Sequence, residues 1–281
     1  MNDSGLRRRR SSGRLRRRAG LTLGLVLVAV WVAAAVLAPL LSPAGPFDQQ
    51  MEQSFRPPSR AHPFGTDDLG RDVLARVLYG GRITLTLGAG VVAVGSALGL
   101  AVGAASGFVG GWTDEVLMRA TEVIMAFPSI ILAMAIAVAL GPGIVNAGLA
   151  MVLVWWPPYA RLVRGEVLAV KQMEYVEASV ALGQTPFGVL WRAILPNVSS
   201  SVIVLVTVDL GGAIITGAGL SFLGLGAVPP SPEWGAMVNA GKELYQQWWV
   251  ATFPGLAMFM VVLGFNFLGD GVRDLLGPGR A

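Results

Sequence analysis

Few side chains in this sequence could carry out covalent or metal chemistry. Its 281 residues include no cysteine and a single histidine, His62, which excludes thiol catalysis, disulfides and histidine-rich metal sites. The two lysines, Lys171 and Lys242, do not lie in a G-x-x-x-x-G-K-[ST] phosphate-binding loop. We therefore expect no catalytic residue, no cofactor and no metal site, and we interpret His62 as a surface loop residue.

The most informative polar residues lie in a stripe between two long hydrophobic runs. Glu174, Glu177, Ala178 and Ala181 recur at three- and four-residue spacing, which places them on one face of a helix over residues 170–182. The small residues admit a close partner, and the two carboxylates can meet basic groups at its rim. Gly183 is expected to end this helix, as a glycine commonly does after the last turn.

Such a stripe is compatible with two roles. An amphipathic helix that lies on lipid headgroups usually carries Lys and Arg on its polar face, whereas this face is acidic. We therefore favour docking onto another protein. Pro186 is expected to open a second short helix, in a position that proline tolerates, and Pro196 is expected to mark its end.

Two further acidic residues lie in or near hydrophobic runs. A charged group inside a bilayer is costly and is by default a functional candidate. Asp209 is expected either to face a translocation path or to contact a partner helix, and both roles stay open. Glu122 lies one helical turn from Arg119, which favours a local pair on the helix surface.

The elements that must position these residues are membrane-spanning helices. The chain is 54% hydrophobic and only 14% charged, whereas an ordinary soluble domain carries about 25% charged residues. A lipid-exposed backbone must satisfy its own hydrogen bonds, and a spanning helix needs about 20 mostly apolar residues. We predict an all-α membrane protein with six transmembrane helices, at residues 21–41, 84–108, 118–140, 143–163, 199–224 and 251–269.

Basic residues orient these spans. Eight arginines lie within residues 7–18 and run directly into the first hydrophobic segment, so we interpret this arm as a cytoplasmic anchor on anionic lipid rather than a nucleic-acid site. The run at 21–41 is about twice the usual length of a signal-peptide core, which favours an uncleaved span. Six spans then place both termini in the cytoplasm. We divide the chain into the arm 1–20, the first span 21–41, an external segment 42–83, and a five-helix core 84–281 that contains a cytoplasmic loop at 164–198.

Glycine and proline predict how the spans pack and bend. The second span carries four glycines on one face, which allow another helix to approach closely: Gly95, Gly99, Gly103 and Gly107. In the third span, Thr113 is expected to cap the helix and Pro128 to kink it. The double proline at 157–158 is expected to distort or stop the fourth helix.

A motif resemblance adds to this interpretation of the loop. Residues 174–197 read EYVEASVALGQTPFGVLWRAILPN. This segment resembles the EAA loop of permease subunits in bacterial ABC importers, which reads Glu-Ala-Ala, a short spacer, Gly, a longer spacer and Ile-Leu-Pro. Here Glu177, Ala178 and Ser179 precede Gly183, and Ile-Leu-Pro stands at 194–196. Ser179 replaces the usual alanine, a small-for-small change.

Three other stretches resemble the C-type permease of dipeptide and oligopeptide importers. They read HPFGTDDLGRDVL at 62–74, YARLVRGE at 159–166 and LSFLGLG at 220–226. Each is short, but their order and spacing are specific, and the resemblance covers nearly the whole chain from residue 21. One departure is Gly217, where many relatives carry glutamate, so we assign no polar role there.

The resemblance implies a type I importer permease bundle in the bacterial inner membrane. The loop would be a coupling helix that docks in a groove of a separate ATPase subunit through Glu174, Glu177, Ala178, Ser179, Ala181 and Gly183. The implied partners are a second homologous permease, two ATPase subunits, an extracytoplasmic peptide-binding protein and membrane lipid, with no nucleic acid. Di- or oligopeptides are the implied substrates, with nickel chelates, glutathione or another small solute as alternatives.

Other function classes fit less well. An ion-gradient secondary carrier predicts inverted repeats and paired intramembrane carboxylates, but this chain has Asp209 and no evident repeat. An integral membrane enzyme would need a recognisable nucleophile–base pair, and we find none.

Overall fold

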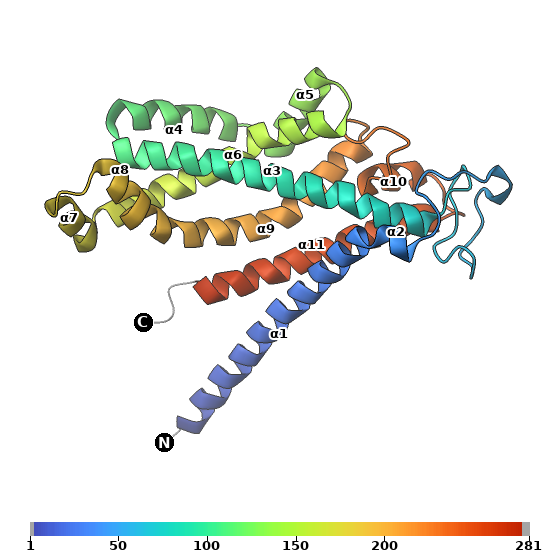
Figure 1. Cartoon of the computed structure of the whole chain (residues 1–281), viewed down its shortest axis with the longest axis horizontal. Coiled ribbons are helices and arrows are strands. Elements are labelled where there is room, and N and C mark those ends of the chain that lie inside the picture. The colour runs from blue at the N-terminus through green and yellow to red at the C-terminus, as the bar shows by residue number, and fades with distance from the viewer. Residues whose placement is uncertain (1–2, 277–281) are drawn as a thin grey trace.

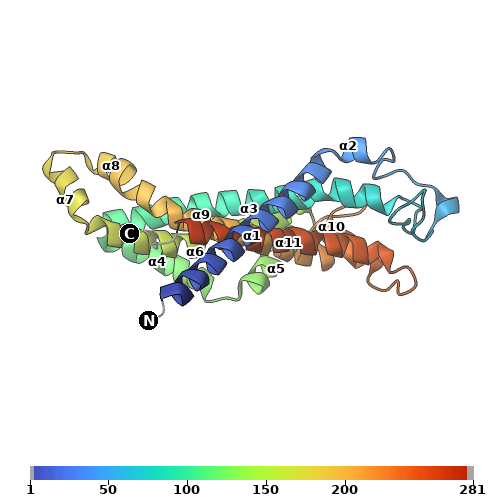
Figure 2. The same ribbon diagram turned by 90° about the horizontal axis from the view of Figure 1, so that it is seen from below.

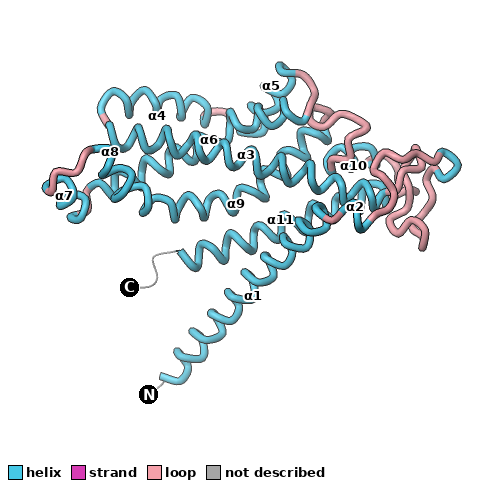
Figure 3. Tube along the Cα trace, in the orientation of Figure 1, coloured by secondary structure: helices cyan, strands magenta, loops and turns pink. Residues whose placement is uncertain are grey.

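The computed structural model describes the backbone of residues 3–276 and the side chains of residues 19–276. Its regular elements in this range are helices, joined by loops as Figure 3 shows. The long helices are α1 (Asp3–Val36), α3 (Val73–Val109), α4 (Gly111–Met125), α5 (Ser129–Leu140), α6 (Ile144–Lys171), α9 (Leu195–Phe222) and α11 (Trp249–Leu276). The short helices are α2 (Ala38–Leu41), α7 (Glu174–Ala181), α8 (Pro186–Val189) and α10 (Trp234–Gly241), with a 3-10 turn at Met51–Gln53 and a π-helical turn at Leu190–Ile194.

The molecule is elongated and has two different ends. One end holds α7 and α8, and the other holds α10 and the loops of residues 42–72 (Figure 1). The starting end of α1 and the final end of α11 both lie toward the α7 end, in Figure 1 and in the perpendicular view of Figure 2. This arrangement places the described chain ends and the predicted cytoplasmic loop on the same side of the helical bundle.

Length and composition identify fewer spans than we predicted. Among the described residues, four helical segments are long and apolar enough to cross a membrane: Ala19–Val36, Val73–Val109, Pro186–Phe222 and Trp249–Leu276. The bent pair α4 and α5 brings the number to five if it is one span. Helix α6 is 28 residues long but contains two prolines beside two tryptophans and a tyrosine. The count of six spans stays a prediction that depends on α6.

The second span starts well before residue 84. Asp72 caps α3 by accepting a hydrogen bond from the Ala75 amide at 2.8 Å, so helix α3 begins at Val73 and includes the whole predicted span 84–108. The last part of the predicted external segment 42–83 is therefore helical, and α3 extends toward the loop end of the molecule.

The third span is broken rather than kinked. Helix α4 ends at Met125, α5 begins at Ser129, and the two helices meet at 88°. Pro128 stands between them in the position that precedes the first turn of α5, where its missing amide hydrogen removes no helical bond. The predicted Thr113 cap is wrong, because α4 already begins at Gly111 and Gly110 precedes it with φ +73°.

The double proline does not stop the fourth helix. Helix α6 continues through Pro157 and Pro158 to Lys171. The predicted glycine face of α3 packs against this region: a methyl group on Gly99 would lie 2.5 Å from the Trp156 carbonyl oxygen and closer still to Tyr159 Cβ. Close packing by these glycines is confirmed, and we infer that it supports α6 where the prolines remove backbone hydrogen bonds.

Candidate functional site

The predicted acidic stripe lies on a short helix at the tip of the molecule. Helix α7 covers Glu174–Ala181, and Val176, only 2% exposed, is its buried anchor. Glu174, Glu177, Ala178 and Ala181 are all exposed. The structure therefore places these four stripe residues together on the outer surface.

The stripe helix is shorter than predicted. Helix α6 ends at Lys171, and residues 172–173 separate it from α7, so residues 170–182 are not one helix. The Lys171 ammonium donates a hydrogen bond to the Phe108 backbone carbonyl oxygen at 2.8 Å. It also lies 5.4 Å from the centre of the Phe108 ring. This contact fixes the end of α6 to the end of α3, and α7 is free to point away from the bundle (Figure 1). Ser179 is half-buried, and its hydroxyl donates to the Tyr175 carbonyl oxygen within α7 at 2.8 Å.

The turn after α7 depends on Gly183. Its φ is +81°, a conformation that glycine adopts readily and other residues rarely do. The Gly183 amide donates to the Val180 carbonyl oxygen at 2.9 Å, and the Gln184 amide donates to the Ser179 carbonyl oxygen at 3.2 Å. A methyl group on Gly183 would meet nothing within 4 Å. The requirement for glycine is therefore conformational rather than steric.

A second short helix follows as predicted and leads into the fifth span. Thr185 caps α8 by accepting from the Gly188 amide at 3.2 Å, and Pro186 occupies the first turn. The π-helical turn at Leu190–Ile194 then joins α8 to α9. Pro196 lies in the first turn of α9, so it opens the fifth span instead of closing the second short helix.

A groove lies between α7 and α8. It has a volume of about 480 Å³, and its lining combines apolar side chains with Glu177 and Lys171. Its apolar lining residues are Phe108, Val176, Val180, Ala181, Pro186 and Val189. The surface beside it is unusually apolar for an exposed loop, because Leu182, Phe187 and Trp191 are 84%, 71% and 62% exposed. An apolar concavity with a few polar groups and exposed large side chains at its edge suits a protein partner.

Sequence reasoning missed the aromatic part of this surface. The rings of Phe187 and Trp191 stack with their centres 6.0 Å apart and their planes 11° from parallel. Their four-residue spacing puts them on one helix face and was the available signal. We call α7, α8 and this aromatic pair the tip surface, defined by residues 174–191.

Polar contacts join α6, the helix that precedes the tip surface, to the helices beside it. Arg164 on α6 donates two hydrogen bonds to the Asp114 carboxylate on α4, at 2.6 and 2.7 Å. The Ser106 hydroxyl on α3 donates to the same carboxylate, and Ser201 on α9 donates to Glu166 on α6 at 2.9 Å. Helix α6, which leads directly to α7, is therefore joined to α4 and α9 by polar side chains.

The two acidic residues near the spans differ in their surroundings. Glu122 forms the predicted pair with Arg119, at 3.2 Å on the helix surface. Asp209 is the fifteenth of the 28 residues of α9 and is half-buried. Its carboxylate lies beside Tyr159 and Trp155, in the middle of α6 and away from Lys171 at the end of that helix. The structure does not bring Asp209 to the tip surface.

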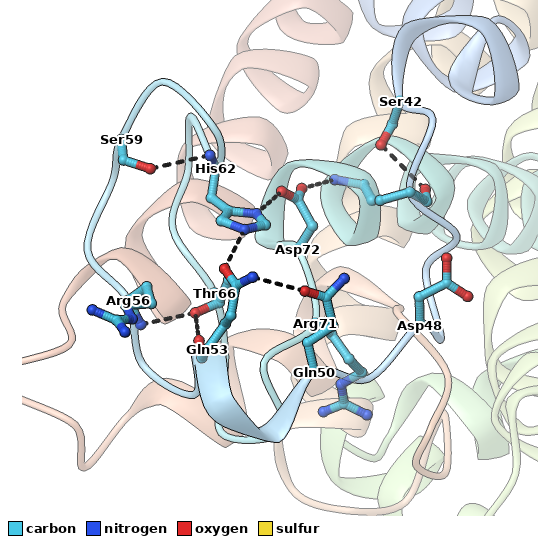
Figure 4. A network of polar contacts seen from close by, with 12 residues as sticks. Ser42, Asp48, Gln50, Gln53, Arg56, Ser59, His62, Thr66, Arg71 and Asp72 are labelled. Carbon is cyan, nitrogen blue, oxygen red and sulfur yellow. Dashed lines mark hydrogen bonds and ion pairs between the residues drawn. The ribbon is translucent and has the colours of Figure 1, made fainter.

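His62 is more buried than we expected. It lies in a loop, but its side chain is only 17% exposed, and its two ring nitrogens contact Asp72 Oδ2 and Gln53 Oε1, each at 2.8 Å. Figure 4 shows this histidine at the centre of the polar network of residues 42–72. Because Asp72 also caps α3, His62 helps to fold this segment onto the bundle. No group of three or more acidic or histidine side chains that could hold a metal ion occurs in the described range.

Comparison with known proteins relates the chain to a transport family. Residues 95–281 match the family model of the binding-protein-dependent transport system inner membrane component. The chain belongs to this family. Residues 8–58 also match the N-terminal transmembrane domain of oligopeptide transport permease C. The protein is therefore a C-type permease component of a binding-protein-dependent ABC importer and not its ATPase, and it is a multi-pass inner-membrane protein that works with ATPase, binding-protein and permease partners.

The sequences of individual relatives align with most of this chain. The glutathione transport system permease protein GsiD of Pectobacterium atrosepticum is 46% identical over 222 residues, 79% of this chain and 74% of the relative. The probable D,D-dipeptide transport system permease protein DdpC of Escherichia coli K12 is 41% identical over 254 residues, covering 90% and 85%. The dipeptide transport system permease protein DppC of Alkalihalophilus pseudofirmus is 39% identical over 257 residues, covering 91% and 84%.

Proposed function

We propose that this permease imports di- or oligopeptides or a peptide-like thiol such as glutathione, using ATP hydrolysed by separate subunits. The observation that carries the substrate class is the agreement among the named relatives, whose glutathione, D,D-dipeptide and dipeptide substrates are all short peptides. Glutathione is the second candidate substrate, because the GsiD relative has the highest sequence identity to this chain of these three. Nickel chelates are an alternative that none of these three relatives' names supports.

The proposed membrane topology has six spans with both termini in the cytoplasm. Helix α6 would be the fourth span and the bent α4–α5 pair the third. The arginines of residues 7–18 would lie against anionic headgroups on the cytoplasmic side. The loops of residues 42–72 would then face outward, toward the binding protein, and the tip surface would face the cytosol.

The proposed role of the tip surface is to receive the ATPase. The exposed stripe of Glu174, Glu177, Ala178 and Ala181, with Ser179 beside it and Gly183 closing its turn, would enter a groove of an ATPase subunit, and the exposed apolar side chains would add buried area. Fully desolvated aromatic side chains at the centre of an interface commonly dominate its binding energy. We include Phe187 and Trp191 in this docking surface for that reason.

The proposed cycle couples two ATPase subunits to this permease and a homologous second permease. ATP binding would draw the ATPase subunits together and move α7, and α6 would carry the movement to α3, α4 and α9 through the contacts of Lys171, Arg164 and Glu166. Each ligand shifts the inward- and outward-facing populations only as far as it binds one state more tightly. The permease itself supplies the path and the mechanical linkage.

Reconstitution tests this function directly. Vesicles containing this permease, its partner permease and ATPase subunits are expected to accumulate labelled L-alanyl-L-alanine or glutathione only with internal ATP and external binding protein. Unlabelled compound of the accepted class should compete. Uptake by this chain alone, driven by a proton gradient, would contradict the proposal and support a secondary carrier.

A further inference from the structure

Asp209 is an unpaired carboxylate in the middle of a span. Within the described part of the chain, no ion pair joins it to a basic side chain, and no basic group is among the groups that act on it. Charged side chains inside membranes usually pair with one another, with backbone carbonyl groups or with a transported ion. The missing cation must come from outside this part of the chain, unless the carboxyl group is protonated.

A second polar group, the Tyr159 hydroxyl, lies beside Asp209 and is incompletely satisfied. Tyr159 on α6 is 0% exposed, and its hydroxyl makes no hydrogen bond of ordinary geometry in the described structure. This hydroxyl faces the Asp209 carboxylate and interacts with it, and the Trp155 side chain also donates toward that carboxylate. A buried polar group without a well-formed hydrogen bond costs about 1–3 kcal/mol, so the retention of this hydroxyl beside a carboxylate without a basic partner calls for a functional explanation.

Open space adjoins this pair on α9. Asp209, Gly212, Thr216 and Gly219 recur at three- and four-residue spacing and form one stripe, and none of them is fully buried. A methyl group on Gly219 would meet nothing within 4 Å, and one on Gly212 would meet only the Trp155 ring, at 3.7 Å. Small and polar side chains with free space beside them suit contact with a polar transported solute, whereas a lipid-facing surface would be apolar.

We propose that Asp209 and Tyr159 form a transient binding site for the primary ammonium group of the transported peptide. This inference rests on the proposed function, because dipeptides and glutathione each carry such a group at one end. An ammonium group has three donors and one positive charge, so it can donate to the Asp209 carboxylate and to the Tyr159 hydroxyl oxygen at once. The stripe of Gly212, Thr216 and Gly219 forms the adjoining wall of the path.

Binding to the assembled transporter without binding protein isolates this site. The probes are labelled L-alanyl-L-alanine and its N-acetyl derivative, which has no ammonium group. The sample is the permease–ATPase complex in lipid nanodiscs with a non-hydrolysable ATP analogue. We expect the complex to bind the free-amine dipeptide about tenfold more tightly or better, the range of a hydrogen bond to a charged group. Asp209→Asn should remove this preference, and Asp270→Asn, on an exposed part of α11, should leave it intact.

Tyr159→Phe provides the second variant. It keeps the buried ring and removes only a hydroxyl whose contact with Asp209 is not a hydrogen bond of ordinary geometry, so a purely structural role predicts little change in thermal stability and an unchanged peptide preference. The proposed site predicts a several-fold weaker preference for the free amine, with the complex still intact.

Several outcomes would overturn the proposal. The first is that the unmodified complex binds both peptides equally or binds neither detectably. The second is that Asp209→Asn keeps the full preference for the free amine. The third is that Asp209→Asn no longer pairs with the second permease, which would assign Asp209 to helix pairing. In each of these cases the unmodified transporter would still show ATP-dependent uptake in the reconstituted vesicles, so failure of this site is distinguishable from failure of the proposed function.

Discussion

At the scale of single residues, Gly183 has the most demanding backbone in the tip surface. Its φ of +81° is outside the range that residues with a side chain usually adopt, yet the space around it is open. A substitution there changes the direction of the turn between α7 and α8 without causing a clash. The position of α8 and its aromatic pair relative to α7 therefore depends on this glycine.

We expect Gly183→Val to uncouple transport. A β-branched residue in the left-handed region costs about 1–3 kcal/mol, enough to shift the turn and misplace the docking stripe. Stimulated ATP hydrolysis and uptake should fall together about tenfold or more, while the amount of permease in the membrane stays normal. Gly165→Ala is the matched control, because a methyl group there also meets nothing within 4 Å and its φ is not positive. Normal coupling in Gly183→Val would remove this glycine from the docking surface.

Glu177 is the stripe carboxylate that also lines the groove. Reversing its charge should repel the basic groups that we expect on the partner's rim, so Glu177→Lys should reduce stimulation of the ATPase by substrate-loaded binding protein and leave basal hydrolysis unchanged. Charged pairs in desolvated interfaces typically account for 2–5 kcal/mol when one partner is lost. Asp270→Lys, at an exposed position of α11 outside both the tip surface and the loops of residues 42–72, should behave like the unmodified protein. Equal stimulation in both variants would argue against a docking role for Glu177.

At the scale of elements, the contact of α3 with α6 decides how the spans are held together. Sequence reasoning found the glycine face of α3 because its period is regular and local. It did not find that α6 passes through Pro157 and Pro158, because the support for that segment comes from a helix about 60 residues earlier in the chain. The sequence also predicts the position of the bend at Pro128, but it predicts a kink where the structure has an 88° break between two helices.

The glycine face supplies a prediction about stability. Gly99→Ala would force a methyl group into the Trp156 carbonyl oxygen and Tyr159 Cβ, and overpacking of this kind typically costs about 1–3 kcal/mol. We expect a lower unfolding temperature and less assembled complex. In Gly90→Ala, on the same helix, the added methyl meets nothing within 4 Å, so its stability should not fall. A stable Gly99→Ala protein would mean that α3 and α6 are farther apart than described.

At the scale of the whole molecule, the predicted elements account for most of the architecture, and tertiary contacts account for the rest. The stripe of α7, the end of its helix at Gly183 and the start of α8 at Pro186 follow from local rules. The groove, the exposed Phe187–Trp191 pair and the His62 network depend on segments that meet only after folding. The same-end placement of α7 and the described chain ends agrees with the predicted topology.

The central claim is that the tip surface faces the cytosol and moves with the ATPase. The absence of native cysteine makes single-cysteine crosslinking clean, so Ala181→Cys can be paired with cysteines around the groove of the ATPase subunit in the reconstituted transporter. We expect a crosslink whose yield changes between nucleotide-free and ATP-bound complexes, and we expect the crosslink to stop uptake reversibly. Labelling of Ala181→Cys by an impermeant reagent from the outer side of the membrane, or uptake that continues while α7 is crosslinked only to lipid, would contradict the account.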